Sequence, residues 1–105
     1  MISKKLLESV LDKEIASINI EENILNYIED KVDYFEINIY ELAHKCKEWA
    51  YKRGFLYWYE NSGLFIKIMY SCKVDFVIDI GEYKKPFEID IDFKACQWIL
   101  DNKES

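Results

Sequence analysis

The stretch FLYWYENSGLFIKIMYSCKVDFVIDI, residues 55–80, decides the fold of this chain. It predicts three β-strands, 55–60, 64–71 and 74–80, with a short hairpin connection at 61–63. Because neighbouring side chains on a strand point to opposite faces, large apolar side chains lie on both faces of the predicted sheet. Each face therefore needs a covering layer, since monomers rarely expose large contiguous apolar patches.

Two helices before this stretch and one after it are predicted to supply such layers. The first spans residues 4–16, with Ser3 as N-cap and apolar residues at helical spacing. The clearest helix follows the N-cap Asn38, has Glu41 in a capping-box position, and ends at Gly54.

The segments between and after these helices are less regular. Residues 17–37 favour short strands, because isoleucine, valine, tyrosine and phenylalanine dominate there. The alternative is a short helix in which Asn19 and Glu22 form a capping box. Beyond the strands we expect a loop at 81–86 and a short strand at 87–89.

The last helix is expected to begin at Asp90 or Asp92 as N-cap and to end near Lys103. Its apolar residues spread wider than one stripe, which is typical of a deeply packed helix. These elements predict an α+β fold: one small domain, 1–105, with an antiparallel sheet of four to five strands and three helices. The preferred arrangement is an α/β/α sandwich; in the alternative, a second subunit covers one face of the sheet.

Composition limits the classes of function. Half of the residues are hydrophobic, and 20 acidic residues against 14 basic ones give a net charge of −6. Because a protein that neutralises phosphates needs clustered lysine and arginine, we expect no nucleic-acid partner. No window approaches a membrane span, and the N-terminal residues lack the apolar core of a signal peptide, so we expect no membrane association.

Three cysteines, far apart in sequence, favour a reducing, cytoplasmic location. Cys46, Cys72 and Cys96 form no C-x-x-C knuckle with each other, so no metal or other cofactor is predicted. The only histidine, His44, lies on the polar side of its helix beside Glu48, a surface pair rather than a catalytic base. No catalytic residue, and hence no enzyme activity, is predicted.

Two concentrations of residues could still bind something. Six carboxylates from Asp75 to Asp92 are interpreted as the solvent-exposed face of a strand and as helix caps. Aromatic residues gather around the 61–63 hairpin and are either core or a binding surface. The possible interaction surface consists of Tyr57, Tyr59, Phe65 and Met69.

The segments NIYELAHKCKEWA (38–50) and FKACQWIL (93–100) resemble those of small uncharacterised bacterial and prophage proteins with a phage ABA-sandwich domain. The resemblance implies a three-layer sandwich and a phage-related origin, and it implies no activity.

Three functions remain open at this point. The first is a small non-enzymatic interaction domain that binds a protein partner or a second copy of itself. The second is an acidic inhibitor that occupies the basic, nucleic-acid-binding groove of a host enzyme. The third is a small-ligand binder or an enzyme without a recognisable motif.

Overall fold

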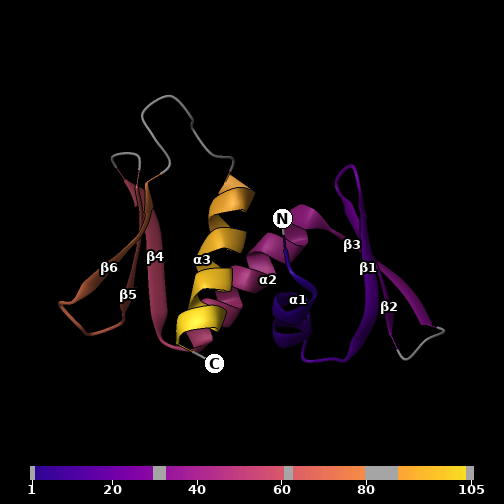
Figure 1. The fold of residues 1–105 in the computed structure, drawn as a ribbon, viewed down its shortest axis with the longest axis horizontal. Helices are drawn as coiled ribbons and strands as arrows, with labels where there is room; N and C mark the ends of the chain where they lie inside the picture. The colour runs from indigo at the N-terminus through magenta and orange to yellow at the C-terminus, as the bar shows by residue number, and fades with distance from the viewer. Residues whose placement is uncertain (1, 30–32, 61–62, 80–87, 104–105) are drawn as a thin grey trace.

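Two antiparallel sheets, each of three strands, flank a layer of three helices in the computed structural model (Figure 1). The structure describes residues 2–29, 33–60, 63–79 and 88–103. In chain order the elements are α1 (Lys4–Leu11), β1 (Ile15–Glu21), β2 (Ile24–Glu29), β3 (Asp33–Asn38), α2 (Ile39–Lys52), β4 (Phe55–Glu60), β5 (Gly63–Ile68), β6 (Val74–Asp79) and α3 (Glu88–Asn102).

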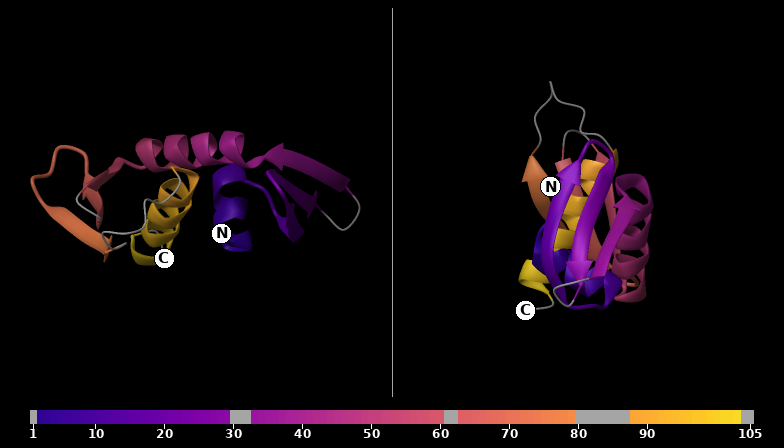
Figure 2. Two further views of the ribbon diagram at one scale, coloured as in Figure 1. Left: turned by 90° about the horizontal axis from the view of Figure 1, so that it is seen from above. Right: turned by 90° about the vertical axis from the view of Figure 1, so that its right-hand side faces the viewer.

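The strands pair in the order β1-β2-β3 in one sheet and β4-β5-β6 in the other. The α+β class is confirmed, but the single sheet of four to five strands is not what the structure shows. The layers also differ from the expected α/β/α order, because the helices lie between the two sheets (Figures 1 and 2). The additional strands come from residues 15–38, where the sequence allowed two interpretations.

The strand interpretation of residues 17–37 is confirmed, and the short-helix alternative is wrong. Asn19 lies within β1, and Glu22 occupies the turn to β2 with a φ of 52°. The predicted first helix is too long, since α1 ends at Leu11. Asp12 takes a left-handed conformation with φ 55° and so stops the helix before β1.

The predicted ends of α2 are confirmed. The side chain of Asn38 accepts a hydrogen bond from the Tyr40 amide at 2.9 Å, and Gly54 follows the C-cap with φ +86°. A glycine takes that conformation without the penalty that a Cβ atom would incur. Ser3 likewise caps α1, accepting from the Leu6 amide at 3.1 Å.

The last helix starts earlier than predicted. Glu88 and Ile89, expected in a strand, already belong to α3, and Asp92 lies inside the helix rather than at its cap. Apolar residues at positions 89, 93, 96 and 100 keep the helical period, and that period starts earlier than the acidic residues chosen as caps. The predicted 81–86 loop and the tip of the 61–63 hairpin lie outside the described residues.

The core is the helical layer together with the inner face of each sheet. Leu25 of β2 and Leu64 of β5 are fully buried on opposite sides of that layer. Between them lie Leu42 and Cys46 of α2 and residues of α1 and α3. Each sheet thus has one face on the helices. Within the described part of the chain, no helix covers the other face (Figure 2).

Candidate functional site

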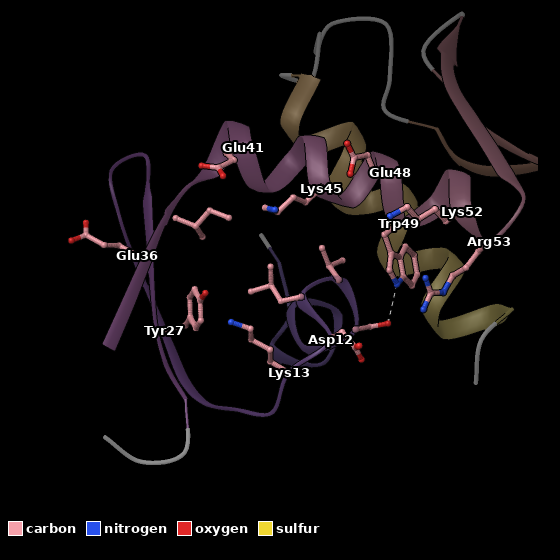
Figure 3. Close-up of a pocket in the computed structure, with 14 residues that line it drawn as sticks. Asp12, Lys13, Tyr27, Glu36, Glu41, Lys45, Glu48, Trp49, Lys52 and Arg53 are labelled. Atoms are coloured by element: carbon pink, nitrogen blue, oxygen red, sulfur yellow. Dashed lines mark hydrogen bonds between the residues drawn. The ribbon is translucent and has the colours of Figure 1, made fainter. Parts of the chain in front are cut away.

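A groove opens between α1, α2 and the inner side of the β1–β2–β3 sheet (Figure 3). We call it the α1–α2 groove. Its volume is about 680 Å³, and its lining includes Asp12 and Lys13 after α1, Tyr27 and Glu36 of the sheet, and Lys45, Trp49 and Arg53 at α2.

Trp49 lies at one end of this groove, where α1 and α2 approach each other (Figure 3). Its indole Nε1 donates a hydrogen bond to Ser9 Oγ of α1 at 3.0 Å, and the Arg53 guanidinium lies 4.4 Å from the ring centroid. Trp49 is almost completely buried. The residue therefore ties α1 to α2, and its contacts are those of a packing residue.

Charges of both signs line the α1–α2 groove. Lys13 pairs with Glu29 at 2.9 Å, and the hydrogen bond to Glu29 raises the pKa of Lys13. Lys45 and Lys52 face Glu41 and Glu48 along α2. Because the signs alternate, the groove does not select an anion or a cation by its field alone.

The strand β3 borders this groove and is open on its other side. Among the described residues it pairs with β2 alone, and five of its six residues are exposed. Tyr34 is 60% exposed and Phe35 38% exposed, although both are large and apolar. Phe35 stacks on Tyr27 with ring centroids 5.4 Å apart, while the Tyr34 hydroxyl donates to Asn26 Oδ1 at 2.6 Å on the opposite face.

A second hollow lies on the outer face of the same sheet. It has a volume of about 530 Å³ and is lined by Glu21, Glu22, Ile24, Asn26, Tyr34 and Glu36. Glu36 lines both this hollow and the α1–α2 groove, because it sits at the open edge of β3. The outer hollow thus reaches from Tyr34 and Glu36 on β3 across β2 to Glu21 at the end of β1.

The net charge of the chain is concentrated in this sheet. Residues 15–38 contain six acidic residues and one lysine, which gives −5, whereas the whole chain carries −6. The rest of the chain is therefore close to neutral. The two sheets differ strongly in charge, which the total of −6 did not indicate.

The four residues of the predicted interaction surface do not lie on one face. The strand alternation places Tyr57 and Tyr59 of β4 on the side of the sheet that faces the helices. Phe65 lies on the outer side, stacked on Trp58 with ring centroids 5.7 Å apart. Met69 follows β5, and its amide donates to the Gly54 carbonyl at 2.7 Å. The strand alternation alone could have separated the two tyrosines from Phe65.

A buried polar network, which sequence reasoning missed, holds β4 to α3. The Tyr57 hydroxyl donates to Asp92 Oδ1, and the Cys96 thiol donates to the Cys46 carbonyl at 3.2 Å. Burial raises the pKa of Tyr57 far above its usual range. The pKa of Cys96 is also raised, mainly by its hydrogen bond with Cys46 and secondly by burial. The Tyr57 hydroxyl and the Cys96 thiol both donate to acceptors within the protein, so the network contributes to packing.

The other sequence candidates stay apart. His44 pairs with Glu48 at 3.2 Å, and both side chains are exposed, as predicted for a surface pair. Asp75 pairs with Lys103, just beyond the C-terminal end of α3, at 3.7 Å, whereas Asp92 contacts Tyr57 from within the first half of α3. The described residues include no cluster of three metal-ligating side chains. Among the same residues, none of the helices has the length and apolar character needed to cross a membrane.

No family model, curated protein or solved structure matches this chain. The resemblance to phage ABA-sandwich proteins therefore stays a prediction.

Proposed function

We propose that this chain is a protein-binding domain whose β1–β2–β3 sheet engages a basic surface of a partner protein. The observation that carries the proposal is the charge of residues 15–38, which hold −5 of the total −6. Complementary charge speeds association and sets the choice of partner. The exposed rings of Tyr34 and Phe35 supply the aromatic area that interfaces use as anchors.

A second candidate function is more specific about the partner. In it, this chain is an inhibitor that occupies the basic, nucleic-acid-binding groove of a host enzyme. The excess of acidic over basic residues in this one sheet favours the inhibitor function, because a phosphate-binding groove is itself basic. The two functions differ in one result: added duplex DNA displaces this chain from the partner only if both occupy the same groove. The cytoplasmic location stays a prediction.

The test is a retention experiment with matched charge variants. The double variant Glu21→Gln/Glu36→Gln removes two charges from the β1–β2–β3 sheet, and Glu60→Gln/Asp75→Asn removes two from the other sheet. We expect the wild type and the second variant to retain the same basic proteins from a lysate of the organism, at low but not high salt. We expect the first variant to lose these proteins. Equal retention by both variants, or retention of acidic proteins only, would contradict the proposal.

A further inference from the structure

The geometry points to a mode of binding: we propose that the partner contributes an extended, basic segment that pairs with the open edge of β3 as a fourth strand. This inference rests on the proposed function, since it names how the acidic sheet holds its partner. An edge strand presents unpaired backbone N–H and C=O groups on alternate residues, and these can bond an incoming strand.

Of the four strands at the sheet edges, β3 is the one best suited to pairing. The ladder β2–β3 keeps a continuous register from Ile24↔Asn38 to Glu29↔Asp33. By contrast, the β1–β2 ladder shifts between Ile15 and Ser17, and the β5–β6 ladder shifts between Leu64 and Phe65. Such irregularities bend an edge and disfavour further pairing.

The remaining edge strand, β4, is regular but more covered than β3. Only two of its six residues, Leu56 and Glu60, are exposed, whereas five of six are exposed in β3. The inner face of β4 lies against the helices through residues such as Phe55. A regular ladder and an accessible strand thus coincide at β3.

The side chains of an added strand would alternate between the two faces of the sheet, and each face carries a hollow. One set would therefore lie on the outer face beside Tyr34 and Glu36, at the margin of the outer hollow, and the other set on the inner face beside Phe35 and Ile37, at the α1–α2 groove. The register pairs Glu36 with Asn26, so its side chain lies on the outer face, next to an added strand on that side.

The charges and rings on each side determine the chemistry of the segment. On the outer face Glu36 lies next to an added strand, and Glu21 and Glu22 extend the acidic hollow across the sheet, so the long basic side chains of lysine or arginine fit that side. The half-exposed ring of Phe35 and the side chain of Ile37 call for apolar residues on the other. The partner segment is thus an extended stretch in which basic and apolar residues alternate.

The probe that tests this is a synthetic peptide of four Lys-Val repeats, measured by fluorescence anisotropy at low salt. Two further peptides carry backbone N-methyl groups, one on every valine and the other on every lysine. N-methylation keeps the charge and side chains but blocks the donors along one edge of the strand. We expect one of the two to bind at least about tenfold more weakly than the parent, and the other to bind nearly as well.

Hydrogen exchange locates the site of pairing in the same complex. We expect the parent peptide to slow amide exchange at alternate residues of β3, with no such alternation in β1 or β4. The Glu21→Gln/Glu36→Gln variant should weaken all three peptides, whereas Glu60→Gln/Asp75→Asn should not.

The possible failures are distinguishable. If the parent and both N-methylated peptides bind equally, charge alone attracts the peptide, and strand addition is overturned while the proposed function stands. If both N-methylated peptides lose binding, or the parent peptide does not bind, pairing along one edge is also overturned. If the wild type and both charge variants retain the same proteins equally well from the lysate, the proposed function itself is overturned.

Discussion

At the scale of single residues, the most consequential contacts are those of Tyr57, Asp92 and Cys96. Tyr57 looked from sequence like part of an aromatic binding surface, yet its hydroxyl donates to a carboxylate that is only 6% exposed. A buried carboxylate without a donor would be costly, so this contact stabilises the packing of α3 on β4. The contact also makes stability dependent on pH.

Alkaline pH should destabilise the fold. The pKa values of Cys96 and Tyr57 are raised from ordinary values of 9.0 and 10.0. The unfolded chain therefore releases these protons as pH rises while the folded chain keeps them, so stability is full below pH 9 and falls above it. Each group contributes a slope of up to about 1.4 kcal/mol per pH unit.

Urea unfolding at a series of pH values from 8 to 10 measures this effect. The window stays below the raised pKa of Lys13, whose ordinary value is 10.5. We expect the free energy of unfolding of the variant Cys96→Ala to fall less steeply than that of the wild type. Parallel pH profiles for the two proteins would show that Cys96 carries no such linkage.

At the scale of elements, caps and irregularities in the ladders determine where each helix and strand ends. The helix α2 shows this most clearly, because Asn38 and Gly54 mark its ends as the sequence predicted. The end of α1 was mispredicted, because an aspartate, not a glycine, takes the left-handed conformation there. Aspartate tolerates that conformation through its short polar side chain, and its presence alone is a weak stop signal.

The cap of α2 gives a direct test at this scale. We expect Asn38→Ala to lower the free energy of unfolding by about 1 kcal/mol, because the Tyr40 amide loses its acceptor. Asn38→Ser keeps an acceptor oxygen at the same position and should cost much less. Chemical denaturation of the two variants makes the comparison. If serine and alanine prove equally destabilising, the cap does not contribute as described.

At the scale of the whole molecule, one layer of helices packs against both sheets. The helix α2 runs directly from β3 to β4, and α1 and α3 lie beside it between the sheets (Figure 2). Neither three-stranded sheet has a second element to cover its inner face apart from this shared layer, within the described residues. The two sheets should therefore unfold together.

Truncation in the shared layer tests that cooperativity. Leu42 of α2 is fully buried, and we expect Leu42→Ala to cost about 2–5 kcal/mol. Tyr40→Ala, on the exposed side of the same helix, should cost less than about 0.5 kcal/mol. Native-state hydrogen exchange of Leu42→Ala should rise in both sheets alike. A rise confined to one sheet would show that the sheets are separate folding units.

Local patterns in the sequence were enough to predict β4, most of β5 and β6, the caps of α2, the surface pair of His44 with Glu48, and the excess of carboxylates. These features depend on neighbours within a few residues, where alternation, helical period and capping act. The same patterns left two interpretations for residues 17–37 and placed Glu88 and Ile89 in a strand instead of α3. The layer order, the contact of Tyr57 with Asp92, and the concentration of charge around an open β3 edge depend on which distant segments pack together. Only the tertiary structure decided them, because each sheet could bury its apolar face against any available layer, and packing selected one shared layer for both.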